Sequence, residues 1–357
     1  MATLNLVAIR DGGSGGENGG FYSPAKEKAA NRSACSFRSV VVRRLRKVIG
    51  GGVTRVKLLF TIGLIFAFLL FASRIGSWMG WNLDYASSVS SSTRGGYTVL
   101  INTWKRNSLL KQSVAYYASC SGTDAIHVVW SESDPPSDSL KAYLRKIVQS
   151  KSQMTHKPNL RFDLNEEDNL NNRFKPIKDL RTDAIFSIDD DVIVPCDTLD
   201  FAFSVWQSAP STMVGFVPRM LWSSKEKIGS TSYKYGGWWS VWWTGTYSMV
   251  LSKAAFFHRK YLDIYTNEMP TSIRDYVTRE RNCEDIAMSL LVANVTGAPP
   301  IWVKGKIFEI GSSGISSLNG HNGKRTKCLN DFISLYGTLP LVPSNVKAVN
   351  AKREWFW

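Results

Sequence analysis

Short apolar runs alternate with helical patterns in the part of the chain that follows position 96. Three runs rich in β-branched and aromatic residues, Tyr97–Trp104, Ala125–Trp130 and Ala184–Ile188, have the length and composition of buried strands. Helical spacing of apolar residues follows the first two of them, over residues 108–119 and 138–150. Strands and helices that alternate in this way predict an α/β fold, with a mixed and mainly parallel sheet and helices on both faces. Functional residues of such sheets gather at the carboxyl ends of the strands.

A longer apolar run, Leu58–Ser73, has sixteen residues and no charge. It lacks the polar face that a helix of a globular protein normally has, although a buried core helix is the alternative. Basic residues precede it, in the cluster Arg43–Lys47 and at Arg55 and Lys57, and such residues mark the cytosolic side of a membrane span. We therefore predict a transmembrane signal anchor over residues 58–78 of a single-pass type II protein whose remaining chain is lumenal. The short span favours a Golgi membrane.

Composition separates the chain into four predicted parts. The segment before the apolar run is rich in glycine, as in Asp11–Gly20, and has little apolar periodicity, which is typical of disorder. A stretch of small residues, Ala86–Gly96, is typical of a flexible stem. The predicted parts are a disordered cytosolic tail over 1–57, the anchor over 58–78, a lumenal stem over 79–96 and a folded domain over 97–357.

The chain has 44 lysines and arginines and 29 acidic residues, which gives a formal net charge of +15. A charge of this size can indicate a nucleic-acid partner. The first 73 residues, however, hold 11 basic and 3 acidic residues, so more than half of the excess lies beside the apolar run. Membrane topology explains this distribution, and no nucleic-acid partner is predicted.

Three adjacent carboxylates, Asp189, Asp190 and Asp191, follow the predicted strand that ends at Ile188. Adjacent carboxylates repel one another and resist burial, so this position indicates a bound cation, with a hard divalent ion as the natural occupant. On extended backbone Asp189 and Asp191 point to one side and Asp190 to the other, which would let one bind metal and another a ribose hydroxyl. A solvated acidic turn is the alternative. The chain has no GxxxxGK[ST] loop, which argues against a P-loop nucleotidase.

Two further clusters carry charges that could serve catalysis. Asn282–Asp285 leads into Ile286–Ala293, the pattern of a helix that begins with acidic residues, and interaction with the helix dipole is the alternative explanation. The basic run Lys324–Cys328 contains Arg325, a residue type that stabilises a departing diphosphate, although such a run is more commonly a solvated surface.

The segment Gly236–Tyr247 carries four of the thirteen tryptophans between glycines, and we predict that it is a loop. Aromatic faces bind sugars or membrane interfaces, and packing in a hydrophobic core is the alternative.

Four of the five cysteines, Cys120, Cys196, Cys283 and Cys328, follow the predicted anchor and therefore face an oxidising lumen. Four cysteines allow three pairings, and their spacing does not choose among them. The sequon that begins at Asn294 is a glycosylation site on the same predicted side.

Six segments of the folded part occur together, in this order, in one known family. They are Leu170–Phe174, 189–191, Leu199–Gln207, Val214–Arg219, Tyr247–Leu251 and Asn282–Met288. Through them the folded domain resembles glycosyltransferase family 64, the exostosin-like C-terminal domain. The resemblance implies a single-domain GT-A fold, dependence on Mn²⁺ and retaining transfer of a sugar from a nucleotide sugar.

The resemblance further implies transfer of mannose from GDP-mannose to the glucuronosyl-inositol phosphorylceramide head group, a glycolipid acceptor. Within the same class, the alternative is an N-acetylglucosaminyltransferase that uses UDP-GlcNAc. The alternative of another class is a non-catalytic Golgi carbohydrate-binding scaffold. The tryptophan segment departs from the Gly/polar segment of the family, so Trp242 and Trp243 are candidate contacts for the acceptor.

Individual roles follow from the positions that match the motifs of the family. Asp191 would hold the metal ion. Asp285 would lie beside the anomeric carbon, and Arg325 would neutralise the departing diphosphate. A disulfide between Cys283 and Cys328 would tether these two catalytic residues. The remaining residues implied to bind the donor are Asp189, Asp190, Glu284, Arg106, Asn169 and Arg173.

Overall fold

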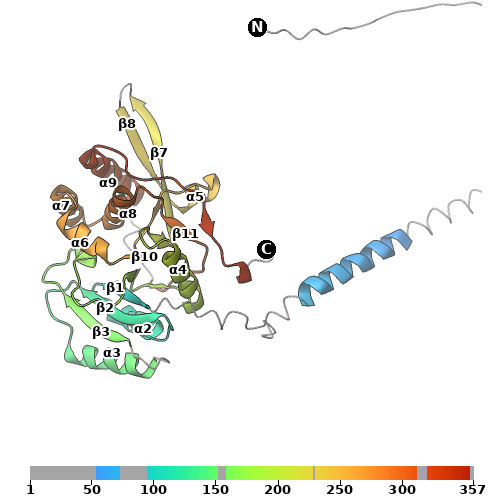
Figure 1. Cartoon of the computed structure of the whole chain (residues 1–357), viewed down its shortest axis with the longest axis horizontal. Helices are drawn as coiled ribbons and strands as arrows, with labels where there is room; N and C mark the ends of the chain where they lie inside the picture. The colour runs from blue at the N-terminus through green and yellow to red at the C-terminus, as the bar shows by residue number, and fades with distance from the viewer. Residues whose placement is uncertain (1–53, 73–94, 152–157, 228–229, 312–319, 354–357) are drawn as a thin grey trace, which may run out of the picture. The chain divides into compact units, whose positions relative to one another are not determined.

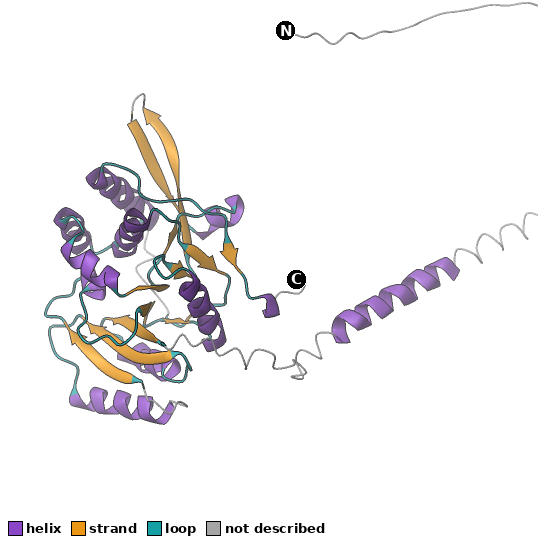
Figure 2. Cartoon of the chain, in the orientation of Figure 1, coloured by secondary structure: helices purple, strands orange, loops and turns teal. Residues whose placement is uncertain are grey.

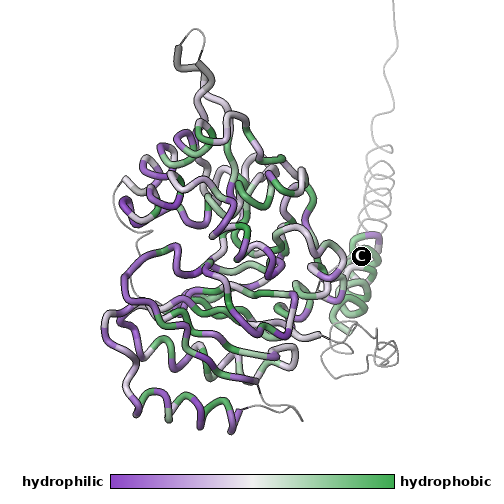
Figure 3. The backbone as a smooth tube through the Cα atoms, turned by 60° about the vertical axis from the view of Figure 1, so that its left-hand side comes forward, coloured by the Kyte–Doolittle hydropathy of each residue, from purple (hydrophilic) through white to green (hydrophobic). Residues whose placement is uncertain are grey.

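The computed structural model describes residues 54–72, 95–151, 158–227, 230–311 and 320–353, and the chain divides into two units between Ser91 and Ser92 (Figure 1). The described part of the first unit is one helix, Thr54–Ala72, which is long and apolar enough to cross a membrane, with a mean hydropathy of 2.1. Hydrophobic residues run along this helix (Figure 3). It begins four residues before the predicted anchor. The rest of the predicted anchor, residues 73–78, lies outside the described residues.

The second unit is built on an eight-stranded sheet. Seven of the eight strands run in one direction, and β10 runs antiparallel to its neighbours β4 and β6. This confirms the predicted mixed, mainly parallel sheet. In spatial order the strands are β13 (Lys347–Ala348), β11 (Ile301–Val303), β6 (Val214–Gly215), β10 (Ala254–His258), β4 (Ala184–Asp189), β1 (Tyr97–Thr103), β2 (Thr123–Trp130) and β3 (Asn159–Leu164).

Helices cover both faces of this sheet (Figure 2), as the alternating pattern predicts. Successive residues of β1 show the reason, because Val99 and Ile101 join one hydrophobic cluster and Leu100 joins the other. The first cluster is completed by α2 (Asn107–Tyr117), α3 (Asp138–Lys151) and α4 (Cys196–Ser208). The second is completed by α6 (Lys260–Asn267), α7 (Thr271–Glu280), α8 (Glu284–Thr296) and α9 (His321–Tyr336).

Helix α8 is the most buried helix of the second unit, and its sequence explains this position. Every residue from Asp285 to Ala293 is buried, so the helix has no polar face to present to water. The helix packs against α6, α7 and α9. It ends at Gly297, whose φ of 62° suits a residue without Cβ. The predicted helix Ile286–Ala293 is confirmed, and its acidic first turn is fixed in the interior.

A long hairpin and two small pairings complete the described fold (Figure 1). The hairpin strands β7 (Pro218–Lys227) and β8 (Ser230–Gly236) are antiparallel, and β9 (Met249–Val250) pairs with β7. Strand β5 (Val192–Ile193) directly follows the acidic triplet in the sequence, and it pairs with β12 (Phe308–Glu309). The short helical turns η1 (Leu170–Phe174) and η3 (Ala351–Arg353) lie in connections.

The prediction of a loop over Gly236–Tyr247 is wrong, because this segment contains the helix α5 (Trp238–Thr244). Gly237 precedes the helix in an extended conformation, and Gly245 ends it at a φ of 67°. The glycines therefore mark the two ends of a short helix. Val241 is its one buried residue and fixes it to the hydrophobic core beside the hairpin.

Candidate active site

The acidic triplet lies at the carboxyl end of β4, where the sheet topology predicts functional residues. The backbone N–H of Asp190 donates to the carbonyl of Asn102, near the end of the neighbouring strand β1. The Asp190 side chain is fully buried, accepts a hydrogen bond of 2.6 Å from Thr103 Oγ1 and forms an ion pair of 2.6 Å with Arg106 Nη2. The other terminal nitrogen of Arg106 donates to Asp191 Oδ2 at 2.8 Å. One guanidinium thus pairs with two adjacent carboxylates.

This arrangement corrects the expected alternation of the three carboxylates. Asp190 and Asp191 meet the same cation, and Asp189 pairs with Arg173 instead. Strand β4 ends at Asp189 and a turn begins at Asp190, so extended geometry no longer separates the side chains that follow.

Arg173 connects the triplet to the start of α8. It lies in η1, is 3% exposed, and donates to Asp189 and, at 3.3 Å, to Ser252 Oγ. Burial by itself would lower the pKa of Arg173, but the nearby charges of Asp189, Glu284 and Asp285 raise it. A permanently positive group therefore stands between two groups of carboxylates.

Asn169 holds η1 in place. Its side-chain oxygen accepts from the backbone N–H of Asn171 at 3.0 Å, and its side-chain nitrogen donates to Thr278 Oγ1 at 3.0 Å. Its side chain therefore supports the turn that carries Arg173, the residue next to the triplet.

Asp285 and Arg325 form a buried ion pair between α8 and α9. Arg325 Nη2 donates to Asp285 Oδ2 at 2.6 Å, and Arg325 Nη1 donates to the hydroxyl of Tyr235 at 2.9 Å. Burial would raise the pKa of Asp285, but the charge and hydrogen bond of Arg325 and the N–H of Ile286 outweigh it, so the pKa is lowered. Asp285 is therefore ionised and Arg325 is protonated at neutral pH.

Glu284, the neighbour of this pair, is in a different state. Burial and the negative charge of Asp285 raise the pKa of Glu284 to about 7, although Arg173 and Arg325 act in the opposite direction. Adjacent carboxylates with pKa values pushed apart are common where one group must stay charged and another must exchange a proton.

A disulfide fixes the relation between the two helices. Cys283, the residue before α8, is bonded to Cys328 of α9, as the family resemblance implies. Cys283 has a φ of 74°, an uncommon backbone conformation for a residue with a side chain. The second disulfide, Cys120–Cys196, joins the segment after α2 to the start of α4, a pairing that the sequence left open.

Comparison with known proteins decides the family once this geometry is known. A model of the glycosyl transferase family 64 domain matches residues 97–354. The chain belongs to glycosyl transferase family 64. This confirms the resemblance that the six segments carried.

Three relatives show how far the similarity to family 64 proteins extends. The chain is 57% identical over 315 residues to glycosylinositol phosphorylceramide mannosyl transferase 1 of Arabidopsis thaliana, which covers 88% of this chain and 94% of the relative. It is 34% identical over 258 residues to human exostosin-2, which covers 69% of this chain and 33% of that protein. It is 40% identical over 187 residues to exostosin-1a of Danio rerio, which covers 50% of this chain and 24% of that protein.

The residues of this family 64 site that can hold a metal ion are few. Among the described residues, no three His, Cys, Asp or Glu side chains gather closely enough to hold an ion by themselves. Asp191 offers one partly exposed carboxylate, whose Oδ2 accepts from Arg106, and Gly311 lies against this side chain, where an added Cβ would be 2.8 Å from the Cβ of Asp191. The site fits a hard ion held by one carboxylate, with substrate oxygens and water as the other ligands.

Three side chains of the site were missed in the sequence. Thr103 is at the carboxyl end of β1, where functional residues of such sheets gather, so its position in the sequence could have identified it. Tyr235 and Ser252 come from the end of β8 and from the connection before β10, and no local pattern marks them. They join the site through tertiary packing.

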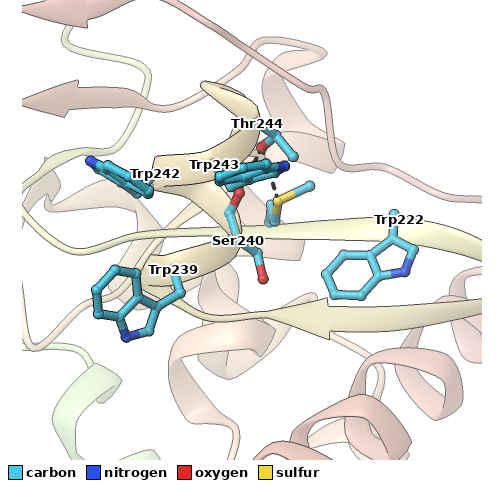
Figure 4. A pocket seen from close by; sticks show the side chains of 7 residues that line it. Trp222, Trp239, Ser240, Trp242, Trp243 and Thr244 are labelled. Atoms are coloured by element: carbon cyan, nitrogen blue, oxygen red, sulfur yellow. Dashed lines mark hydrogen bonds between the residues drawn. The ribbon is translucent and has the colours of Figure 1, made fainter.

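The remaining predicted residues lie at the surface. Asn294 is exposed in the last turn of α8. Trp242 and Trp243 are 58% and 82% exposed on α5, where with Trp239 and Trp222 they line a groove of about 510 Å³ (Figure 4).

Proposed function

We propose that this chain is a retaining mannosyltransferase that transfers mannose from GDP-mannose to the glucuronosyl-inositol phosphorylceramide head group. The observation that carries the proposal is the identity of 57% over 94% of a relative named for mannosyl transfer to this class of lipid. The geometry is consistent with it, because carboxylates and arginines from five parts of the chain form ion pairs in the candidate site.

We further infer that residues 97–357 form a single GT-A domain. The strand order and the acidic triplet at the end of β4 support this assignment. In this arrangement the nucleotide lies across the carboxyl ends of the parallel strands, near Arg106 and Arg173.

Two buried guanidinium groups support binding of an anionic donor. Within the described residues, the Nε atoms of Arg173 and Arg325 are buried and have no hydrogen-bond partner. Buried donors are normally paired, and a diphosphate oxygen is the kind of acceptor that suits a guanidinium. We propose that these two side chains move when the nucleotide sugar binds, and that the movement brings both Nε–H groups to the diphosphate.

The proposed mechanism assigns separate tasks to the residues around the buried pair. Arg325 stabilises the negative charge that develops on the departing diphosphate, and Asp285 supports the positive charge at the anomeric carbon. Glu284 contacts the sugar of the donor or acceptor. The acceptor hydroxyl attacks from the side of the leaving group, and the departing phosphate accepts its proton, which retains the anomeric configuration. Mn²⁺ bound at Asp191 would supply further charge neutralisation at the diphosphate.

The metal proposal can be tested by binding as well as by turnover. Asp191→Ala removes the carboxylate, and Gly311→Ala places a methyl group against it. Both variants should weaken Mn²⁺ binding in the presence of GDP, measured by titration calorimetry of the full chain. Gly323→Ala, where a Cβ meets no atom within 4 Å, is the matched control. Full turnover in the presence of a chelator would contradict the proposal.

The donor is tested with a panel of nucleotide sugars. We expect Mn²⁺-dependent transfer from GDP-mannose and retained anomeric configuration in the product, determined by NMR. Transfer from UDP-GlcNAc alone would favour the N-acetylglucosaminyltransferase, and an inverted product would rule out the mechanism. If Asp191→Ala restored the normal sphingolipid glycans of cells that lack the protein, a non-catalytic scaffold would be favoured.

The proposed location is the Golgi membrane, with the second unit in the lumen. The apolar helix Thr54–Ala72 and the basic residues that precede it support a type II anchor. We also propose that Trp242 and Trp243 contact the acceptor, and the exposure of both indoles supports this role.

A further inference from the structure

Helix α5 exposes an unusual amount of aromatic surface. Trp239, Trp242 and Trp243 are 75%, 58% and 82% exposed, and Trp222 of β7 is 40% exposed beside them. Figure 4 shows the indoles of these residues around the groove. We call these four residues the tryptophan surface. Large aromatic side chains gathered on one surface indicate a contact with another apolar surface.

The chemistry of the groove favours a lipid over a soluble glycan. Its seven lining residues carry no charge, and apart from the indoles its polar side chains are the hydroxyls of Ser240 and Thr244. Thr244 Oγ1 already donates to the carbonyl of Ser240 at 2.8 Å. A sugar site needs several directed hydrogen bonds, whereas indoles, apolar with one N–H each, are typical of the boundary between a membrane and water.

The hairpin sequence that follows Trp222 has an excess of positive charge. The sequence between Trp222 and Gly236 contains three lysines and one glutamate. A segment with this excess of positive charge is attracted to anionic lipids, including those with inositol phosphate head groups.

The tryptophan surface is linked through the backbone to the candidate active site. Tyr235, which accepts a hydrogen bond from Arg325, is followed by two glycines and then by α5. A Cβ on Gly236 would lie 2.6 Å from side-chain atoms of both Met220 and Trp222, so this glycine lets the hairpin and α5 pack closely. The two-glycine connection therefore joins α5 to the residue that accepts a hydrogen bond from Arg325.

We propose that the tryptophan surface is a membrane-interface contact, which seats the catalytic part of the chain on the bilayer that contains its acceptor. The nature of the acceptor rests on the proposed function, whereas the contact with lipid does not. A second copy of this chain or a soluble glycan is the competing occupant.

The contact is tested with the full chain reconstituted in vesicles of phosphatidylcholine and phosphatidylinositol. The fluorescence of the two indoles is obtained by subtracting the signal of the double variant Trp239→Ala/Trp243→Ala from the signal of wild type. We expect phosphatidylcholine with brominated acyl chains to quench this difference signal. Both side chains are highly exposed, so the variant should fold, and Trp239→Ala alone provides a second variant. An unquenched difference signal would overturn the proposal.

Turnover provides the second readout. Two acceptors are compared, the intact lipid and its released head group. We expect the double variant to lower the ratio of their transfer rates, lipid over head group, by about tenfold, because the lipid is no longer held close to the site. The matched control is Tyr143→Ala, an aromatic residue that is 47% exposed on α3, far from α5 (Figure 1). It should change neither the ratio nor the quenching.

The remaining outcomes separate the rival occupants. If the double variant lost transfer to both acceptors equally and the difference signal was not quenched, the tryptophans would be identified as a glycan contact and the proposal would be overturned. If the double variant had a different oligomeric mass and the difference signal was not quenched, the tryptophans would be identified as an interface between copies, and this result would also overturn the proposal. If wild type transfers mannose to neither acceptor, the proposed function fails, and the quenching experiment still decides the contact.

Discussion

Arg325 and Asp285 form the buried ion pair to which the proposed mechanism assigns catalysis. Each is nearly buried, and each neutralises the other at 2.6 Å. A pair of this kind contributes little to stability compared with apolar residues of similar size, although loss of one partner is costly. The pair is therefore better explained by function than by stability, and this distinction can be measured.

We expect Arg325→Met alone to lower the free energy of unfolding by about 3–5 kcal/mol, because Asp285 keeps a buried and unpaired charge. The double variant Asp285→Leu/Arg325→Met should regain most of this stability, while its turnover stays at least about 100-fold below wild type. Denaturation of the full chain in detergent and mannose transfer measure the two effects. The exposed pair Arg279–Glu280 is the control, where removal of both charges should cost less than about 1 kcal/mol. A double variant with normal turnover would contradict the catalytic assignment.

Glu284 predicts a pH dependence with a defined sign. Its pKa is raised from 4.5 to about 7 by burial and by Asp285, so the folded protein binds this proton more tightly than the unfolded chain does. The stability from this proton is fully present below pH 4.5 and is lost as pH rises through about 7. We expect Glu284→Gln to remove this component of the slope in denaturation experiments at a series of pH values. A slope in Glu284→Gln identical to that of wild type would refute the assignment.

At the scale of elements, the site depends on how α8 and α9 are joined. Helix α8 brings Glu284 and Asp285 into the interior in its first turn, and α9 brings Arg325 to them. The residue that precedes α8 has a positive φ and is bonded to α9 through a disulfide. The two disulfides of the second unit therefore have different predicted effects on function.

Replacement of Cys283 and Cys328 by serine should lower the free energy of unfolding by about 4 kcal/mol, the loop entropy expected for residues 45 apart. Replacement of Cys120 and Cys196, which are 76 apart, should cost about 4.5 kcal/mol. We expect turnover, measured at a temperature where both variants are folded, to fall much further in the first variant. Equal turnover would show that the disulfide near the site has no positioning role.

At the scale of the whole molecule, the sequence predicts a membrane topology. The apolar helix Thr54–Ala72 follows a strongly basic segment, and this pattern predicts that the N-terminal side is cytosolic and the rest of the chain lumenal. Asn294 is exposed at the surface of the second unit, and this allows a direct test.

We expect translation with microsomes to give a chain whose C-terminus is protected from protease and whose gel mobility shifts on deglycosylation. Asn294→Gln should abolish the mobility shift without affecting protection. Digestion of the C-terminal part in intact microsomes would show the opposite orientation.

The sequence by itself determined the elements and much of the chemistry. The apolar runs and helical patterns of residues 97–188 predicted the first strands and helices, because local patterning reflects which parts of each element are buried. The position after a predicted strand directed attention to Asp189, Asp190 and Asp191. The family resemblance assigned roles to Asp285 and to Arg325 of the basic run.

Tertiary structure decided which of these groups meet. Arg106 joins Asp190 to Asp191, Arg173 lies between the triplet and α8, and Tyr235 completes the buried pair from a distant hairpin. It also decided that the tryptophan segment is a helix with its indoles exposed. Pairings across more than 80 residues, such as Arg106 with Asp190, depend on the order in which strands and helices pack, and local sequence does not specify that order.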